Sequence, residues 1–345
     1  MSDVLVRRVG ATGRITLNRP DALNAVTLGM VREITRALAV WEEDKDVRIV
    51  VIDATGDRAF AAGGDIVALY EAGKSGAVDD ARSFWAEEYA LNERIARFGK
   101  PFVAMMSGIV MGGGVGVSAH GSHRFVTDTT TLAMPECSIG LVPDAGGSYL
   151  LARSPGAFGR YAGLTGARLK AGDTIYSGFA DAFIPRGAWP EAVVRLEETS
   201  EPDAALKLTE PCEPETDAKT RAEIDKVFAA EGPVRLAHAL ESASGPWARA
   251  AAKRLRAACP LSIHVADHMV AAARGLTIAD ALRAEYRFVW RAFTEGDFLE
   301  GIRAAVIDKD RRPRWAIPTL EDVTEANVAK MCASLGPNEL QLFGD

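Results

Sequence analysis

Two strand-like runs that each end in a glycine-rich turn constrain the fold of this chain more than any other feature. VRIVVIDAT, residues 47–55, is an almost continuous β-branched run, and KPFVAMMSGIVMGGG, residues 100–114, repeats the pattern. Such apolar runs are typical of strands that are covered on both faces. Because each run is followed by a turn and a helical pattern, the sequence predicts an α/β fold with a mainly parallel sheet.

The flanking segments add a hairpin and several helices. VLVRRV and GRITLN, within residues 4–18, meet at a glycine-containing turn and predict two short antiparallel strands. Apolar residues recur at helical spacing from Thr27 onward and again over Arg82–Arg97. The polar stretch Glu71–Asp80 is expected to be a loop.

The character of the chain changes after about Pro185, where amphipathic helical patterns with polar joints replace the strands. The stretch Glu201–Thr216 is rich in Pro, Glu and Asp and is the best candidate for a boundary. We therefore expect a core over residues 1–200 and a helical region over residues 201–345.

Charge and composition argue against several classes of protein. The net charge of −7 disfavours a nucleic-acid partner, although a few local cations and backbone N–H groups could still hold an anionic small ligand. The start MSDVLVRRVG has no apolar signal region, and no run of about 20 apolar residues follows, so we expect no membrane span and a soluble cytoplasmic protein. The four cysteines lack zinc-ligand spacing, and His264 and His268 lack the Glu of an HExxH motif, so no metal site is expected.

The two glycine turns are candidates for binding a ligand oxygen. Gly63–Asp65 and Gly112–Gly114 each follow a strand pattern and precede a helical one. A glycine N–H is unshielded by a side chain, and two such groups converging on one point form an oxyanion hole. Neither turn matches GxxxxGK[ST] or a GxGxxG nucleotide fingerprint.

Two carboxylates lie in the apolar, glycine-rich stretch Gly112–Leu151. They are Glu136, which follows Pro135, and Asp144, in the sequence PDAGG. When two acids lie close together in a semi-apolar pocket, their interaction makes their pKa values differ from each other. Such perturbed pKa values are typical of catalytic groups.

The ordered set of motifs resembles the crotonase (enoyl-CoA hydratase/isomerase) superfamily. The segments that carry the resemblance are RPDALNAVT, AFAAGGDI, GIVMGGGVG and MPECSIGLVPDAGGSYLL. The resemblance implies a spiral of ββα units that binds acyl-CoA thioesters, with the N–H groups of Gly64 and Gly113 as the oxyanion hole. It also implies that Ala22 and the turn Ala62–Ile66, including Asp65, hold the adenosine end of CoA.

Three further features favour the 3-hydroxyisobutyryl-CoA hydrolase subgroup of that superfamily. Gly116 stands where hydratases carry the first of two glutamates, so only Glu136 of that pair is retained, and Asp144 is the additional acid. The segment Glu285–Trp315 is similar to the C-terminal signature of the subgroup. FWAEEYALN is similar as well, and in it Glu88 would face the acyl group and bind its 3-hydroxyl. A solvated helix face is the alternative for Glu88, because Glu87 and Glu93 are equally acidic.

The implied reaction is hydrolysis of a short 3-hydroxyacyl-CoA to the free hydroxy acid and CoA, as in valine degradation. Glu136 could attack the thioester to form a mixed anhydride, or could activate water while Asp144 orients it. CoA is part of the substrate, and no cofactor is implied. Relatives often form trimers, which leaves a homo-oligomer open for this chain.

Two other functions stay open from the sequence. In an enoyl-CoA hydratase or isomerase, Glu136 would move a proton and Asp144 would act as the second acid. In a non-catalytic acyl-CoA binder, neither acid would be needed beside the thioester. Gly116 and the C-terminal segment favour hydrolysis over both alternatives.

Overall fold

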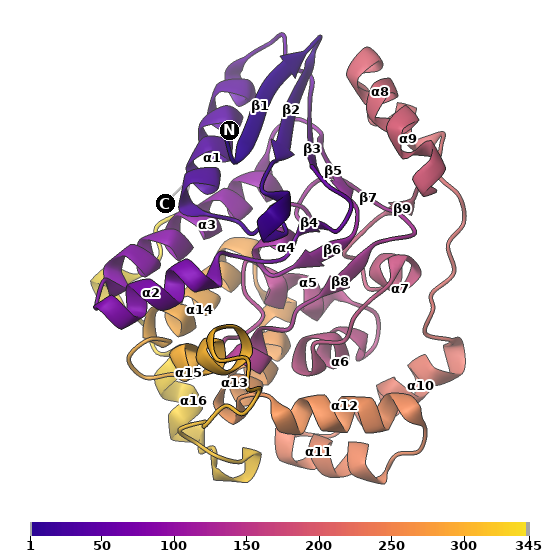
Figure 1. Ribbon diagram of the computed structural model, residues 1–345. Coiled ribbons are helices and arrows are strands. Elements are labelled where there is room, and N and C mark those ends of the chain that lie inside the picture. The colour runs from indigo at the N-terminus through magenta and orange to yellow at the C-terminus, as the bar shows by residue number, and fades with distance from the viewer. Residues whose placement is uncertain (1, 343–345) are drawn as a thin grey trace.

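A computed structural model describes residues 2–342 of the chain (Figure 1). Within them, six strands form one sheet in the order β1-β2-β3-β5-β7-β9. β1 pairs antiparallel with β2, and every later pair is parallel. The predicted hairpin and the mainly parallel α/β sheet are therefore confirmed. The strands are β1 (Val4–Val9), β2 (Thr12–Leu17), β3 (Ile49–Ala54), β5 (Phe102–Met106), β7 (His123–Val126) and β9 (Ala182–Phe183).

A second, smaller sheet positions the functional residues. It has the order β4-β6-β8, all parallel, and consists of β4 (Ala59–Ala61), β6 (Ile109–Met111) and β8 (Thr131–Ala133). Each of its strands follows a strand of the large sheet and precedes a helix, which is the predicted ββα unit. The three helices are α2 (Ile66–Ser75), α4 (Gly113–Gly116) and the 3-10 helix η2 (Glu136–Ile139). Because the strands are parallel, the turns that follow them meet at one edge.

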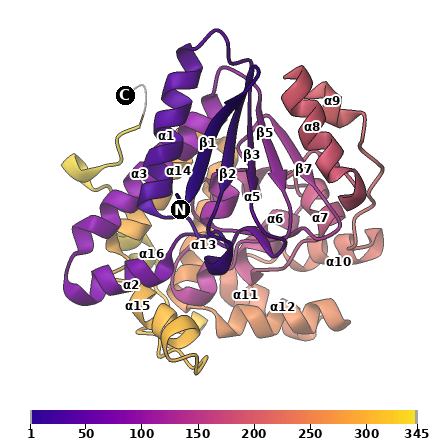
Figure 2. The ribbon, with the colours of Figure 1, turned by 45° about the horizontal axis from the view of Figure 1, so that its top comes forward.

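Helices cover both faces of the large sheet, as Figure 2 shows for α1 and α3 on one side and α8 and α9 on the other. The strands alternate accordingly: Val50 and Ile52 belong to the larger apolar core, whereas Ile49 and Val51 pack toward α8 and α9. The helices of this part are α1 (Leu28–Glu43), α3 (Val78–Arg97), α5 (Gly147–Arg153), α6 (Phe158–Thr165), α7 (Ala171–Tyr176), α8 (Trp189–Thr199) and α9 (Asp203–Leu206).

The C-terminal region is helical and packs against the small sheet's end of the molecule (Figure 1). α14 contacts α3, and α15 contacts both α2 and η2. The larger apolar core includes side chains from both sides of residue 200, such as Val115 and Phe288. The helices are α10 (Ala218–Val227), α11 (Gly232–Ser242), α12 (Pro246–Ala257), α13 (Pro260–Ala272), α14 (Ile278–Arg291), α15 (Phe298–Ile302) and α16 (Glu325–Cys332). None of the helices within residues 2–342 is long and apolar enough to cross a membrane.

The expected loop over Glu71–Asp80 is wrong. α2 continues to Ser75, Gly76 ends it with φ 83°, and α3 begins at Val78. Polar residues here form exposed helix surface, and Asp79 and Asp80 in the first turn of α3 favour a helix N-terminus through its partial positive charge. The polar residues therefore indicated exposure and not a loop, and the turn is limited to Gly76 and Ala77 between the two helices.

Candidate active site

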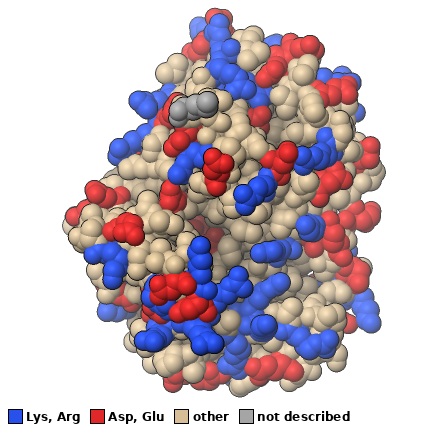
Figure 3. Space-filling model, in the orientation of Figure 1, with Lys and Arg blue, Asp and Glu red and all other residues tan. Residues whose placement is uncertain are grey.

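The turns that follow β4, β6 and β8 enclose a cavity of about 160 Å³ at the edge of the small sheet. Figure 3 shows a hollow in the same face, near the place where Figure 1 has the ends of β4 and β6. α2 and α3 form the opposite wall of the cavity. Its lining contains both glycine turns and three acids: Ala62, Gly63, Gly64, Ile66, Leu69, Phe84, Trp85, Glu88, Met111, Gly112, Gly113, Pro135, Glu136, Ser138, Ile139, Leu141 and Asp144.

The N–H groups of Gly64 and Gly113 lie side by side. A Cβ added to Gly113 would stand 3.3 Å from the nitrogen of Gly64. Gly63 and Gly112, with φ of 109° and 47°, turn the chain into this geometry in a region that favours glycine. Within residues 2–342, neither N–H donates to another group of the protein. The two predicted donors are thus close together and unpaired, as the predicted oxyanion hole requires.

Glu88 lies against this pair of donors and not on a solvated helix face. Its side chain is buried on α3, and a Cβ on Gly113 would collide with its Oε1. Burial, and then the nearby Asp144 carboxylate, raise the pKa of Glu88 well above its ordinary value. Its neighbour Glu87 points outward and forms an ion pair with Arg32. Of these adjacent glutamates, Glu88 is the one that faces the cavity.

Asp144 is held by a side chain from α3. The hydroxyl of Tyr89, itself fully buried, donates to Oδ2 of Asp144 over 2.7 Å. Burial raises the pKa of Asp144 to about 6, while the Tyr89 hydrogen bond acts in the opposite direction. A hydrogen bond to the ionised form favours that form. Asp144 is therefore the acid of the cavity that is set to carry the negative charge.

Glu136 differs from Asp144 in its partners. It begins η2 directly after Pro135, is 5% exposed, and its Oε2 has no hydrogen-bond partner among residues 2–342. Burial, followed by the charge of Asp144, raises the pKa of Glu136 well above its ordinary value. With no side chain donating to it, Glu136 holds a proton more tightly than Asp144. Because the two carboxyls interact, they titrate as a pair, and the first proton that the pair binds goes to Glu136.

The space beside Gly116 is filled. A Cβ at this position would stand 2.7 Å from Nδ2 of Asn92 and 2.9 Å from Cβ of Ala145. Asn92 is fully buried on α3, one turn after Glu88. The structure therefore has no room for a glutamate at residue 116 and offers Asn92 and Ala145 in its place. Sequence reasoning noted Gly116 but gave Asn92 no part in the site.

Sequence reasoning also missed Glu285, which clamps the turn that carries Asp144. This fully buried residue of α14 accepts hydrogen bonds from the N–H of Gly146 (2.8 Å), the N–H of Ser148 (2.9 Å) and the hydroxyl of Ser148. Burial raises its pKa to about 8. The only signal in the sequence was an acid on the apolar face of a helical pattern. Its partners lie nearly 140 residues away.

Only some of the residues predicted to hold the adenosine end of CoA line the cavity. Ala62 and Ile66 line the cavity. Asp65 instead accepts from the N–H of Ala68 at the start of α2 and forms an ion pair with Arg19 at 3.2 Å. Ala22 lies in the short helix η1 (Pro20–Ala22), outside the cavity lining. The structure thus gives Asp65 a capping role.

Residues that could hold a metal ion do not gather anywhere in residues 2–342, where no three His, Cys, Asp or Glu side chains form such a group. Of the acids that line the cavity, Asp144 accepts a hydrogen bond from Tyr89, whereas Oε1 of Glu88 and Oε2 of Glu136 have no hydrogen-bond partner among the described residues.

Known proteins similar to this chain carry the names of several CoA-dependent enzymes. The family model described as enoyl-CoA hydratase/isomerase matches residues 12–332. The chain is 38% identical to 3-hydroxyisobutyryl-CoA hydrolase, mitochondrial, of Danio rerio, over 99% of the chain and 92% of that protein. The Gallus gallus protein of the same name is 36% identical, over 99% and 91%.

Two solved structures superpose closely on the fold. An enoyl-CoA hydratase from Rhodobacter sphaeroides 2.4.1 is 47% identical with a TM-score of 0.94, covering 99% of this chain and 100% of that one. A carnitinyl-CoA dehydratase from Mycobacterium thermoresistibile is 42% identical with a TM-score of 0.94, and both chains are fully covered. The predicted fold is confirmed by these likenesses.

The comparison contradicts the expected cytoplasmic location. The relatives from Gallus gallus, Danio rerio and Homo sapiens are all named as mitochondrial proteins. That prediction was wrong, because it took the absence of an apolar signal region at the N-terminus as sufficient for the cytoplasm.

Proposed function

Because the chain belongs to the enoyl-CoA hydratase/isomerase family, we propose that it hydrolyses the thioester of a short 3-hydroxyacyl-CoA to the free hydroxy acid and CoA. The observation that carries this proposal is the acid pair Glu136–Asp144 beside two unpaired N–H groups, with the first hydratase position, at Gly116, closed. 3-Hydroxyisobutyryl-CoA is the first substrate to test, because the curated relatives are named for it. The reaction then belongs to valine degradation.

Hydrolysis needs stabilisation of the carbonyl oxygen, activation of a nucleophile and a proton for the departing thiolate. The N–H groups of Gly64 and Gly113 bind the oxygen as it becomes negatively charged. In one route, Glu136 takes a proton from water, the water oxygen bonds to the carbonyl carbon, and the C–S bond breaks while Asp144 protonates the sulfur. The pair must enter the reaction with one proton. That proton rests on Glu136 in the free protein and moves to Asp144 before Glu136 acts as base or nucleophile.

The second route begins with covalent attack by Glu136. Its carboxylate oxygen bonds to the carbonyl carbon, CoA departs as the thiol with a proton from Asp144, and a mixed anhydride remains. Water then opens the anhydride, one of its protons returning to Asp144 and the other leaving with the product acid or to solvent. Glu136 is close enough to Gly112 that a Cβ there would stand 3.1 Å from its Oε1, so the carboxyl lies beside the donor turn.

Glu88 is proposed to bind the 3-hydroxyl of the acyl group. It lines the same cavity as the acid pair, and its Oε1 has no hydrogen-bond partner within residues 2–342. A buried polar atom without a partner is costly, which favours filling the site with a group that can hydrogen-bond to it. The proposed reaction needs no cofactor, because this chain's N–H groups and carboxyls supply every part of it and CoA is part of the substrate.

Hydration of an enoyl-CoA is the second candidate. It is favoured by the solved Rhodobacter sphaeroides structure, which carries the name enoyl-CoA hydratase and is 47% identical to this chain. In this reaction Glu136 and Asp144 would together hold the attacking water. The closed position at Gly116 opposes it.

The deciding experiment follows thiol release from (S)-3-hydroxyisobutyryl-CoA and, in parallel, loss of enoyl absorbance from crotonyl-CoA. Both assays are run on the native protein and on Glu136→Gln, with Glu87→Gln as the exposed control on α3. We expect thiol release that falls by about a thousandfold or more in Glu136→Gln and is unchanged in the control. Hydration without thiol release would overturn the proposal and assign Asp144 to the hydratase role.

A further inference from the structure

Asn92 of α3 is a fully buried side chain whose amide nitrogen and amide oxygen both lack a hydrogen-bond partner among residues 2–342. Asn24, which is also buried, differs in this respect. Its Nδ2 donates to the carbonyls of Thr55 (3.0 Å) and Ala59 (2.9 Å). Its Oδ1 accepts from the N–H of Arg19 (2.7 Å). Because an unpaired buried amide costs free energy, Asn92 requires a partner that the described groups of the protein do not supply.

Asn92 lies between α4 and the turn that carries Asp144. A Cβ on Gly116 would stand 2.7 Å from its Nδ2, 3.0 Å from its Oδ1 and 2.9 Å from Cβ of Ala145, the residue after Asp144. Glu88 precedes Asn92 by one turn on the same face of α3, and its Oε1 also has no partner within the described part of the chain. Unpaired amide and carboxyl atoms are therefore buried on one face of α3, next to the Asp144 turn.

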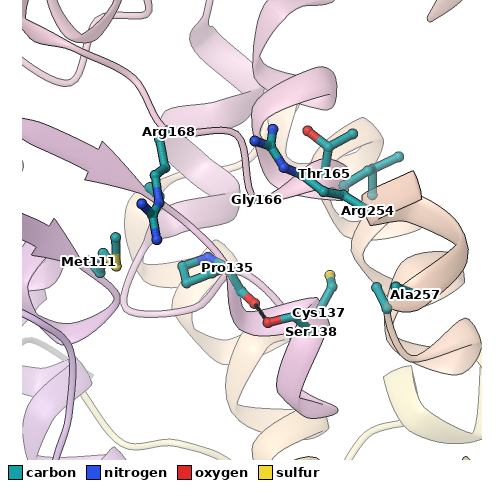
Figure 4. Close-up of a pocket in the computed structure, with 12 residues that line it drawn as sticks. Met111, Pro135, Cys137, Ser138, Thr165, Gly166, Arg168, Arg254 and Ala257 are labelled. Carbon is teal, nitrogen blue, oxygen red and sulfur yellow. Dashed lines mark hydrogen bonds between the residues drawn. The ribbon is translucent and has the colours of Figure 1, made fainter. Parts of the chain in front are cut away.

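The acid-lined cavity meets a larger cavity on the side away from α3. The larger cavity measures about 380 Å³, and the two share Met111, Pro135 and Ser138. Figure 4 shows these three residues, with Arg168 and Arg254 elsewhere in the lining of the larger cavity. A substrate that enters through the larger cavity displaces water from that side. Water held at the α3 side stays in place beside the acids.

We propose, on the basis of the proposed function, that Asn92 holds one buried water molecule next to Glu88 and the Asp144 turn, and that this water is the one consumed in hydrolysis. A water molecule can donate to the amide oxygen and accept from the amide nitrogen, so it satisfies both ends of Asn92. The Glu88 carboxyl, one turn away, is a further polar partner for it. Leucine at this position would fill a similar volume without unpaired polar atoms, so the amide is explained by a polar ligand and not by packing.

Asn92 positions the water and exchanges no proton with it. In the covalent route, the water oxygen bonds to the carbonyl carbon of the mixed anhydride, and the bond from that carbon to the Glu136 oxygen breaks. One water proton goes to Asp144, and the other leaves with the product acid or to solvent. In the direct route, the same water gives a proton to Glu136 and attacks the thioester carbon, while Asp144 protonates the departing sulfur. Asn92 is a positioning residue in both routes.

The test replaces the amide with an apolar group. Asn92→Leu keeps a similar volume but cannot bond to water. Ser262→Ala, which removes a buried hydroxyl of α13 outside the acid-lined cavity, is the control and should keep the native kcat and KM. With (S)-3-hydroxyisobutyryl-CoA, we expect kcat of Asn92→Leu to fall by about tenfold to a hundredfold and KM to change by less than about twofold. Its Tm should be unchanged or higher, because no buried polar atom is left unpaired.

Hydroxylamine gives a readout that a merely structural role of Asn92 would not change. It attacks the same carbonyl carbon and yields a hydroxamate, but it does not depend on the water held by Asn92. After subtraction of the uncatalysed reaction, Asn92→Leu should raise the hydroxamate share of the product by about tenfold. An unchanged kcat, or slower hydrolysis with an unchanged hydroxamate share, would overturn the inference. If Asn92→Leu does not fold, Asn92→Val is measured in the same way.

A crystal structure of the native protein separates this inference from the proposed function. A water molecule bonded to the Asn92 amide would support the water site, whereas an amide bonded only to protein groups would overturn it. This readout does not depend on the reaction that the protein catalyses. If the native protein releases no thiol from the ester, the proposed function fails, and the crystal structure decides the water site alone.

Discussion

The backbone donors at Gly64 and Gly113 and the carboxyls at Glu136 and Asp144 face the same cavity, but the chain holds them in different ways. The donors follow directly from β4 and β6, which are paired strands of one small sheet. Asp144 depends on Tyr89 of α3, and its turn depends on Glu285 of α14. Local backbone geometry thus builds the proposed oxyanion hole, whereas long-range side-chain contacts place the acids.

This difference has a consequence for substitutions. Changes at the donor turns alter the shape of the cavity itself, since little space surrounds the glycines. Tyr89 and Glu285 do not line the cavity, and changes there act on it through Asp144 and the turn that carries Asp144. Four predictions test the donor turns and the side-chain contacts of the acids, from the largest expected effect on activity to the smallest.

The largest effect is expected from Gly113→Ala. The added methyl would collide with Oε1 of Glu88 and crowd the nitrogen of Gly64 at 3.3 Å. We expect kcat to fall by about a hundredfold to a thousandfold, the range for loss of an oxyanion donor. Gly99→Ala is the control, because its added methyl meets open space. Equal activity in the two variants would show that the paired N–H groups are not the oxyanion hole.

Next is Glu285→Ala, which leaves three buried donors of the Asp144 turn without their acceptor. We expect a loss of about 3 kcal/mol in the free energy of unfolding and a fall in kcat of about a hundredfold as Asp144 shifts. Denaturant unfolding and steady-state kinetics on the folded fraction measure the two effects. Glu285→Gln, which keeps one acceptor oxygen, should be intermediate. An unchanged kcat in the folded fraction would show that Glu285 stabilises the fold but does not position Asp144 for the reaction.

Tyr89→Phe should act through pH. Asp144 has a pKa of about 6, and once it is protonated the pair Glu136–Asp144 has no carboxylate left to act as base or nucleophile, so native kcat should fall as the pH drops through about 6. Tyr89 donates to the ionised carboxylate, and removing that bond raises the pKa of Asp144. The acid limb of the pH–rate profile should therefore move upward by about one pH unit. A limb that stays in place would mean that Asp144 does not control it.

The smallest effect on activity is expected from Glu88→Gln. Burial raises the pKa of Glu88 well above its ordinary value, so the folded protein prefers the neutral form, which glutamine imitates. When the pKa of an acid is higher in the folded state than in the unfolded state, the free energy of unfolding falls as the pH rises above the unfolded-state pKa. Glu88→Gln should therefore raise Tm, by more at pH 8 than at pH 5, with a change in KM of only about twofold to fivefold. Glu87→Gln should show no such pH-dependent gain in calorimetry, since Glu87 is exposed and paired with Arg32.

The ββα repeat, the two donor turns and the identity of both acids could be predicted from the sequence, because each depends on residues within a few positions of one another. The apolar runs specified strands covered on both faces, and the glycines specified turns that other residues rarely adopt. Even there, polarity alone misled the expectation at Glu71–Asp80, where an exposed helix surface and a loop have the same composition.

The sequence by itself determined where the strands end and which acids follow them. Only the tertiary structure decided that Glu88 and not Glu87 faces the cavity, that Tyr89 donates to Asp144, that Glu285 holds the Asp144 turn, and that Arg168 and Arg254 meet at one cavity. The reason is physical. Periodicity along the chain specifies which face of an element is buried, but the partner of a buried polar group is fixed by packing between elements that are far apart in the chain.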